Sequence, residues 1–330
     1  MSNGVAKPAL APSPGWLLPA LAALLSSVFF GLNAIACKIL FAPTAEGHFD
    51  PESLFVARGF WSLPLFFALA VATMPRSHPR LSRKTLGLLA LCGLAYGPGT
   101  IALSTIGASK TSAAHAVLLL SLLPPLASVL AALLLRERLP AVRIIAIVIG
   151  VIGAVLLTSS RSGAGATLAG DLLIGGFIFA WAILTTGIRK LDTSLPPLFV
   201  AGVFGVVGCV LLAIIGFAAG RSDAILIPLN HFDATTIIWF DVELVLLLAL
   251  VGQILQSITL RTLSVAMGAA LMSYGSIAAG LAASIILLGE RLTIGEVLAG
   301  GFLVIALGLS IVPTTEIARL IRTLRGRVMS

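Results

Sequence analysis

Side chains able to bind a ligand are few in this sequence, and most stand alone inside long apolar stretches. The tightest grouping is Gln253, Gln256 and Ser257, whose i, i+3, i+4 spacing places them on one face of a helix. Amides and hydroxyls on one face recognise a polar ligand through hydrogen bonds, or they bind a neighbouring helix instead. We take this stripe as the best candidate for the lining of a binding cavity.

Asn33 and Arg58 are polar residues inside two other apolar runs. Arg58 can bind a substrate carboxylate, pair with a carboxylate of the protein, or stack on Trp61 three residues later. Asn33 either contacts a ligand or donates to a neighbouring backbone carbonyl. A guanidinium in an apolar run is costly, so it is expected to face a cavity or another helix.

The most irregular stretch is 95–100, AYGPGT. Proline removes a backbone hydrogen bond and glycine permits bending, so a kink or an unwound turn is expected at Gly97, Pro98 and Gly99. Tyr96 would then line the cavity, and a packing kink is the alternative. Pro124 and Pro125 predict a second break. Both breaks are candidate hinges.

The remaining candidate binding residues are polar or aromatic groups in three further runs. Trp181 and Thr185 lie one helical turn apart, and Tyr274 and Ser276 lie near the middle of their run. His115 near the end of a run either titrates during transport or is a hydrogen-bonded structural histidine.

Catalytic chemistry finds little support. The chain has four scattered histidines, and no Walker-type loop or metal-ligand spacing is visible, so we expect no cofactor, no metal and no enzymatic activity. All acidic residues fall in predicted loops or at the ends of apolar runs. Proton-coupled carriers often use a membrane-buried carboxylate, so a facilitator, an exchanger or a carrier coupled through His115 fits better.

The apolar runs that position these residues define the fold class. The chain is 58% hydrophobic and 10% charged, whereas a soluble domain carries about 25% charged residues. The composition therefore requires a lipid bilayer, and the net charge of +8 is read as a signal for membrane orientation rather than for binding nucleic acid. Ten runs reach the length of a membrane helix: 16–41, 52–74, 85–107, 111–135, 140–158, 168–190, 195–219, 242–262, 265–289 and 293–313.

Basic residues predict the orientation. With the N-terminus inside, the bases outside are Lys110, Arg161, Arg221 and Arg291, and most of the others lie in inner loops and in the C-terminal tail. Both termini are therefore expected in the cytoplasm. The excess of Arg over Lys, with abundant Ala, Leu and Gly, hints at a GC-rich bacterium and hence at an inner membrane.

Two pairs of similar sequence segments predict an internal repeat. "RERL" at 136–139 is matched by "GERL" at 289–292, and "FGLNAIACK" at 30–38 resembles "WAILTTGIR" at 181–189. Five spans per half is an odd number, so the second half enters the membrane from the opposite side. We expect a five-helix repeat at 16–158, an inverted repeat at 168–313, and a basic cytoplasmic tail at 314–330 that serves as an orientation signal or binds anionic lipid.

The acidic residues of the repeated phrase have a local interpretation. Glu137 and Glu290 are expected to fix tight turns, with a gating role as the alternative. Thr293 and Glu296 have capping-box spacing, and Pro140 stands where a first helical residue is expected.

These features together resemble the drug/metabolite transporter superfamily in its ten-helix form with two EamA-like halves. The resemblance rests on Pro124 and Pro125 ahead of "ERL", on "GERL", on the start "FGLNAIACK" with Phe30 in place of the usual Trp, and on Arg58. One departure is the ninth span, which has Ser276 and Ile277 in place of a Pro-Pro pair.

The resemblance implies an all-α integral membrane protein with ten transmembrane helices in two inverted five-helix repeats. It also implies export or exchange of small metabolites by alternating access, most often neutral or aromatic amino acids. Sugar-phosphate or nucleotide-sugar exchange is the alternative, although only Lys38 and Arg58 would serve the anion. A membrane-embedded enzyme and a channel or scaffold are alternatives from other classes. Two complete halves suggest that a monomer suffices.

Overall fold

A computed structural model describes residues 17–42, 49–75, 81–135, 141–160, 166–191, 195–231, 233–263 and 265–311. Within these ranges the chain is helical and contains no β-strand, which confirms the all-α fold class. The repeated-phrase residue Glu137, the expected helix start at Pro140 and the basic tail at 314–330 lie outside the described residues.

The first half of the chain contains five long helical segments. They are α1 (Leu17–Phe41), α2 (Pro51–Ala72), the continuous run of α3 (Arg83–Leu94), η1 (Ala95–Ala102) and α4 (Leu103–Lys110), the run of α5 (Ala113–Leu119), η2 (Leu120–Leu122) and α6 (Leu123–Leu135), and α7 (Ala141–Ser159).

The second half repeats this arrangement with one added connection. Its segments are α8 (Leu168–Lys190), α9 (Pro197–Ala218), the short η3 (Ser222–Leu226) and α10 (Ile227–Asn230), the run of η4 (Thr236–Gly252) and α11 (Gln253–Thr262), α12 (Val265–Leu288) and α13 (Ile294–Ile311). The eighth span was predicted at 242–262, and that boundary is wrong, because the helix already begins at Thr236.

The helices are long and apolar enough for a multi-pass membrane protein. Nine segments of the described chain meet the length and composition expected of a membrane span, and the tenth, Ile294–Ser310, is a slightly shorter apolar helix. Large aliphatic side chains point outward, as with Leu18 and Ile286, which are 72% and 77% exposed. Lipid is as apolar as these side chains, so an apolar outer face is stable in a bilayer.

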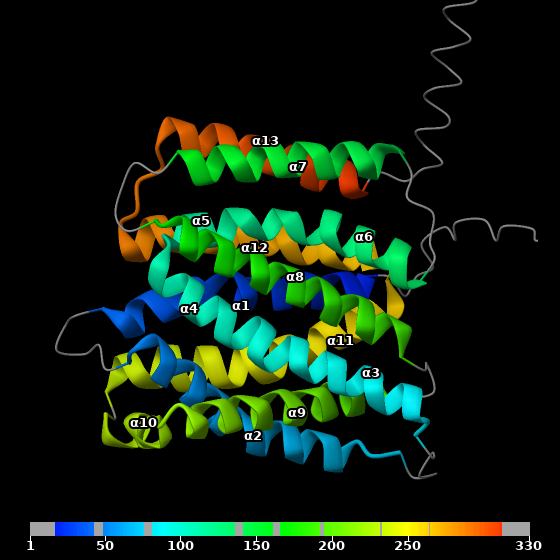
Figure 1. Ribbon diagram of the computed structural model, residues 1–330, viewed down its shortest axis with the longest axis vertical. Helices are drawn as coiled ribbons and strands as arrows, with labels where there is room; N and C mark the ends of the chain where they lie inside the picture. Colours follow the sequence, from blue (N-terminus) through cyan, green and yellow to red (C-terminus); the bar gives the residue numbers. More distant parts are fainter. Residues whose placement is uncertain are drawn as a thin grey trace, which may run out of the picture.

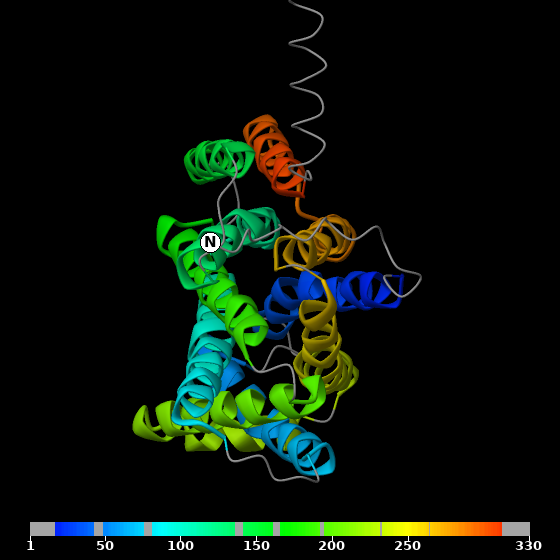
Figure 2. The ribbon, with the colours of Figure 1, turned by 90° about the vertical axis from the view of Figure 1, so that its right-hand side faces the viewer.

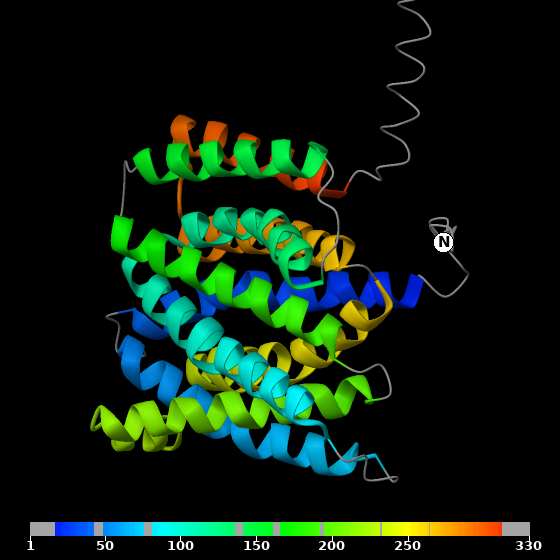
Figure 3. The ribbon, with the colours of Figure 1, turned by 45° about the vertical axis from the view of Figure 1, so that its right-hand side comes forward.

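Each main helix contact made by one half of the chain has a counterpart made by the other half. Helix α2 packs against α9 and α7 against α13, at opposite ends of the molecule, while α1 packs against α12 as α8 packs against α5 and α6 (Figures 1 and 2). Helix α1 also contacts η4 and α11, just as α8 contacts α3, η1 and α4, beside which it lies in Figure 3. Exchanging the five segments of one half for those of the other leaves this set of contacting pairs unchanged.

Within the long helical segments of the described chain, three stretches depart from regular α-helix, and two of them coincide with the expected hinges. Residues Ala95–Ala102, which include Gly97, Pro98 and Gly99, form a π-helix. A 3-10 turn, Leu120–Leu122, immediately precedes the helix that carries Pro124 and Pro125. The third irregular segment, η4, is also a π-helix, and it occupies the span of the second half that corresponds to η1. π-Helices are rare in proteins overall, but those that do occur are frequently found at functional sites.

Candidate functional site

A buried guanidinium lies among the central helices. Arg58 on α2 is 4% exposed, and its Nη1 donates a hydrogen bond of 2.9 Å to Oδ1 of Asn33 on α1. Asn33 thus accepts from a side chain rather than donating to a backbone carbonyl. Trp61, the alternative stacking partner of Arg58, instead donates its indole N–H to the carbonyl of Ile225 at 3.1 Å. The Nε of Arg58 has no hydrogen-bond partner within the protein.

A buried carboxylate, which was not predicted from the sequence, completes this part of the site. Glu243 on η4 is 5% exposed, and its Oε1 has no hydrogen-bond partner within the protein. Because the helix begins at Thr236, Glu243 lies inside the span Thr236–Thr262 and not at its end. The prediction that no carboxylate is buried in the middle of a span is therefore wrong, and its absence no longer speaks against carboxylate-driven proton coupling.

Arg58 and Glu243 carry opposite charges but do not form an ion pair with each other. The Arg58 charge lies within electrostatic range of Glu243 and of the phenol of Tyr96, yet no ion pair joins Arg58 to a carboxylate in the described chain. Two opposite charges held apart in a buried place cost free energy unless each meets a partner. The arrangement fits a ligand that carries both an anionic and a cationic group.

Tyr96 is fixed by aromatic neighbours. Its ring lies edge-on to Phe66 and Phe204, with both ring centroids 5.5 Å away, and its hydroxyl is buried without a hydrogen-bond partner within the protein. The π-helix brings it close to α9, where a methyl group on Gly97 would lie 2.2 Å from the carbonyl oxygen of Gly208. The irregular backbone therefore depends on glycine at both positions.

The polar stripe on α11 is buried, and its side chains lack hydrogen-bond partners within the protein. Gln253 Oε1, both side-chain polar atoms of Gln256, and Ser257 Oγ have no hydrogen-bond partner within the protein. These atoms therefore do not bind a neighbouring helix, which was the alternative reading of the stripe. Each buried polar group without a partner lowers the free energy of unfolding by about 1–3 kcal/mol. Four such atoms in one short segment therefore indicate a role other than stabilising the fold.

An aromatic cluster lies next to this stripe. Trp181 on α8 stacks on Phe177 with centroids 5.5 Å apart, and its ring is 4.6 Å from that of Phe30 on α1. A methyl group on Gly252, the residue before Gln253, would lie 3.7 Å from the Phe30 ring. The predicted partner of Trp181, Thr185, donates to the carbonyl of Ala182 in its own helix. Trp181 Nε1 itself has no partner within the protein.

His115 lies in a different place, at the N-terminal ends of α5, α8 and α13. Its Nε2 is 2.9 Å from Glu296 Oε1, and its Nδ1 is 3.4 Å from Asp171, which also accepts from Thr111. Asp171 was not singled out from the sequence, because it stands at the start of a span. The network ties the two halves together and leaves His115 outside the group around Arg58.

Glu290 acts on the other half of the molecule. Its two carboxylate oxygens accept hydrogen bonds from the backbone N–H groups of Ala113 and Ala114, at 2.9 and 2.8 Å, and thereby cap the N-terminus of α5. The predicted capping box is confirmed, since Thr293 N donates to Glu296 and Glu296 N donates to Thr293. The carboxylates of this loop thus stabilise helix starts in both halves.

A second network at the same end joins α2 to the chain after α9. Asp50 accepts from the backbone N–H groups of Glu52 and Ser53, and Arg221 donates two bonds to Glu52 Oε2. Partial burial alone would raise the pKa of Asp50, but hydrogen bonds from Ser53 and Glu52 and the Arg221 charge hold it below its usual value. The hydrogen bond to Glu52 and the nearby carboxylates raise the pKa of Arg221.

The two candidates on α12 separate. Ser276 donates to the carbonyl of Ser27 at 2.8 Å, so it joins α12 to α1. Tyr274 is 36% exposed, and its hydroxyl would lie 3.3 Å from a methyl group on Gly308 of α13. The structure therefore does not bring Tyr274 to the group around Arg58.

The space beside the site is narrow. A cavity of about 10 Å³ adjoins Asn33, Phe30 and Phe177. In the described chain, no group of three or more His, Cys, Asp and Glu residues is arranged to hold a metal ion. His115 illustrates why, because its two carboxylate neighbours face opposite nitrogens of the ring.

The fold is that of a multi-pass membrane protein, with a buried polar centre between its helices. The EamA-like transporter family model matches residues 17–159, so this part of the chain is similar to that family. The match confirms the resemblance to the drug/metabolite transporter superfamily.

Solved structures agree with this assignment at the level of the fold. One of them, titled "Crystal structure of protein", is 15% identical, covers 89% of this chain and 95% of its own chain, and superposes with a TM-score of 0.60. At this identity the similarity establishes the fold alone. No curated protein matches the chain.

Proposed function

We propose that the protein is a secondary transporter that exports or exchanges neutral or aromatic amino acids across a bacterial inner membrane by alternating access. The proposal rests on one observation: Arg58 and Glu243 are both buried and lie within electrostatic range of each other, but they form no ion pair. A guanidinium binds a carboxylate, and a carboxylate binds an ammonium group, so the couple matches the backbone of an amino acid.

The substrate side chain would lie along the neighbouring aromatic residues. Phe30, Phe177 and Trp181 present ring surfaces from α1 and α8, and the polar stripe of Gln253, Gln256 and Ser257 begins next to them. Aromatic walls with a few polar groups are typical of pockets for small apolar ligands. Tyr96 is assigned to the carboxylate end, beside Arg58.

Sugar phosphates fit this site less well. A dianionic group would meet Arg58 but also the carboxylate of Glu243, and the other in-span base, Lys38, lies within electrostatic range of Glu290 instead. Like charges at close range disfavour binding.

The transport cycle follows from the proposed inverted halves, 16–158 and 168–313. Secondary transporters built from such halves bind substrate near the midplane and expose it in turn to either side. The π-helices η1 and η4 and the break at Leu120–Leu122 are the proposed hinges. Both termini are proposed to lie in the cytoplasm, and one chain is proposed to suffice for transport.

Counterflow into liposomes tests the substrate class. Purified protein is reconstituted with unlabelled phenylalanine inside, and uptake of labelled phenylalanine is measured against competitors. We expect phenylethylamine, which lacks the carboxylate, and phenylpropionate, which lacks the ammonium, to compete about 30-fold less well or worse, since a lost partner of a buried charge costs about 2–5 kcal/mol. Counterflow of phosphorylated sugars only would refute the proposal.

Two variants assign the two ends of the substrate. Arg58→Gln should abolish the preference for phenylalanine over phenylethylamine, and Glu243→Gln should abolish the preference over phenylpropionate. Repeating the assay with and without an imposed pH gradient shows whether export is coupled to protons, a possibility that the buried Glu243 reopens. If both variants keep both preferences, the substrate is bound elsewhere.

A further inference from the structure

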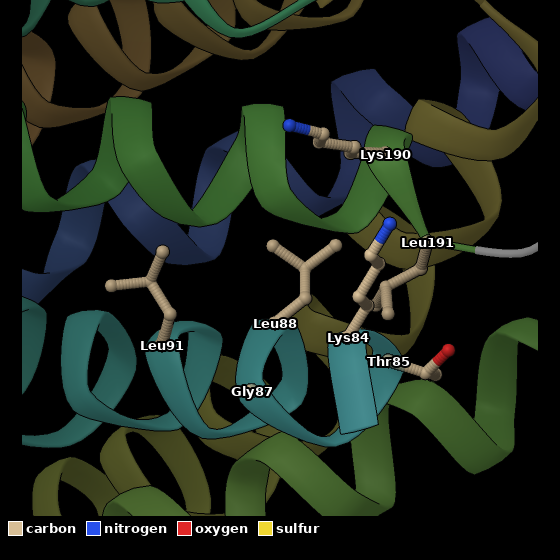
Figure 4. A pocket seen from close by; sticks show the side chains of 7 residues that line it. All are labelled: Lys84, Thr85, Gly87, Leu88, Leu91, Lys190 and Leu191. Atoms are coloured by element: carbon tan, nitrogen blue, oxygen red, sulfur yellow. The ribbon is translucent and has the colours of Figure 1, made fainter. Parts of the chain in front are cut away.

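A long groove runs along the outer surface between two adjacent helical segments, α8 and the run of α3 and η1. At the end of the molecule where α3 begins and α8 ends, it opens into a cavity of about 480 Å³ (Figure 4). A second cavity of about 500 Å³ continues along the same two segments. Leu91 lines both cavities, so together they form one surface, which we call the α3–α8 groove.

The groove is cationic at one end. Lys84 in the first turn of α3 and Lys190 at the end of α8 line the first cavity, and Figure 4 shows the Lys84 side chain extending from α3 toward α8. Both lysines are exposed, and neither forms an ion pair with a carboxylate of the described chain. Two unneutralised ammonium groups at the mouth of one cavity attract an anion.

The rest of the groove is apolar. Below the lysines it is lined by Leu88, Leu91 and Leu191, and further along by residues such as Leu94, Pro98, Phe179 and Ile183. From Leu91 to Leu103 the helical path is about 18 Å at 1.5 Å per residue, close to the roughly 15 Å of one hydrocarbon leaflet. The groove thus has the length and polarity of a lipid chain with its head group.

We propose that the α3–α8 groove binds an anionic phospholipid of the cytoplasmic leaflet. Its phosphate lies between Lys84 and Lys190, and one acyl chain follows the apolar path past Leu91. Basic pockets between membrane helices on the cytoplasmic side are suited to anionic head groups. A second copy of this chain is a poorer occupant, because its own lysines would repel this end. An amino acid is also poorer, because no carboxylate lines the groove to meet its ammonium.

Native mass spectrometry of the full chain in detergent tests the charged end. Phosphatidylglycerol and phosphatidylcholine with matched acyl chains are titrated separately, and bound lipid is counted. We expect tighter binding of phosphatidylglycerol, weakened about 20-fold in the double variant Lys84→Ala with Lys190→Ala, since each lysine near an anionic lipid contributes about fivefold. The matched control is Lys110→Ala with Arg291→Ala, which removes two exposed charges elsewhere and should leave binding unchanged.

A second pair of variants tests the apolar path and keeps the proposal falsifiable if the lysine variants prove unstable. A side chain on Gly87 would meet no atom within 4 Å, so Gly87→Phe should fill the first cavity without disturbing the packing and should weaken binding of phosphatidylglycerol. Gly301→Phe on α13 is an equally open position outside the groove and serves as the control.

Several outcomes would overturn the proposal. Equal affinity for phosphatidylglycerol and phosphatidylcholine, or wild-type binding in both groove variants, would show that the groove does not select an anionic lipid. Displacement of the lipid by an equal concentration of glycerophosphate, which lacks acyl chains, would mean that the lysines bind a free phosphate instead. Because the readout is lipid binding, its failure leaves the proposed transport activity untouched.

Discussion

At the scale of single residues, the polar centre is defined by what its groups lack. Arg58 has one partner in Asn33, and Glu243 Oε1, Tyr96 hydroxyl and Trp181 Nε1 have none within the protein. A protein core satisfies nearly all of its buried polar groups, so unpaired groups gathered on facing helices indicate a binding function rather than a structural one. Satisfied groups such as Thr185 and Ser276 serve helix packing instead.

The sequence located part of this centre and missed its carboxylate. Asn33, Arg58 and the glutamine stripe stand alone in long apolar runs, so their burial could be predicted. Glu243 was assigned to a span end, because Asp233 and Asp241 upstream made the preceding stretch look like a loop. The fold instead starts the helix at Thr236, where Asp233 caps the chain by accepting from Thr236 N at 2.9 Å.

Glu243→Gln is expected to weaken transport of the amino acid much more than Asp241→Asn. Both changes neutralise a carboxylate on η4, but Glu243 is 5% exposed beside Arg58 and Asp241 is only partly buried. The apparent KM for counterflow should rise about 30-fold or more in the first variant and stay within about twofold in the second. Equal effects of the two variants would remove Glu243 from the binding site.

At the scale of helices, the irregular segments were predicted where proline and glycine mark them. The π-helix at Ala95–Ala102 and the break before Pro124 follow directly from backbone chemistry. The π-helix at Thr236–Gly252 carries no proline and could not be predicted in this way. It packs against α1 and α2, and such contacts between distant parts of the chain are not contained in a local pattern.

Gly97→Ala should destabilise the protein, and Gly87→Ala on the same helical run should not. A methyl group at position 97 would lie 2.2 Å from the carbonyl oxygen of Gly208, whereas at position 87 it would meet nothing within 4 Å. Overpacking costs about 1–3 kcal/mol, and an exposed Gly to Ala change in a helix gains up to about 1 kcal/mol. Thermal unfolding in detergent measures both, and an unchanged midpoint for Gly97→Ala would mean that α9 moves away at no cost.

The electrostatic interaction between the start of α2 and Arg221 in the connection after α9 should weaken in acid. The pKa of Asp50 in the folded protein lies below its ordinary value of 3.8, so its contribution to stability is present above about pH 4 and is lost as the pH falls through the lower folded value. The unfolding midpoint of Asp50→Asn should therefore lie below wild type at pH 7 and approach it below pH 3.8. Asp223→Asn, an exposed neighbour, is the control. A difference that persists undiminished in acid would assign the effect to something other than charge.

At the scale of the whole molecule, the inverted five-helix repeat stays a prediction. The repeated phrases in the sequence pointed to two halves of five spans, and the observed contacts are exchanged when one half replaces the other. The sequence could not place the networks between halves, such as His115 with Asp171 and Glu296, because these residues are distant along the chain and their spacing carries no local signal.

The orientation of the whole molecule can be tested with two single cysteines. Ser82, at the start of α3, and Ser222, after α9, are both exposed. The excess of basic residues on one side predicts that they lie on opposite sides of the membrane. The native Cys37, Cys92 and Cys209 are buried, so they should not react with a membrane-impermeant maleimide.

We expect Ser222→Cys to be labelled in intact cells, and Ser82→Cys to be labelled only after the membrane is opened. The wild-type chain, treated in parallel, should remain unlabelled. The reversed pattern would place the lysine end of the α3–α8 groove outside the cell, which would contradict both the proposed topology and the leaflet assigned to the bound lipid. Labelling of both positions in intact cells would mean that the two ends of the bundle do not lie on opposite sides of a bilayer. A multi-pass arrangement of these helices therefore requires that only one of the two cysteines is labelled in intact cells.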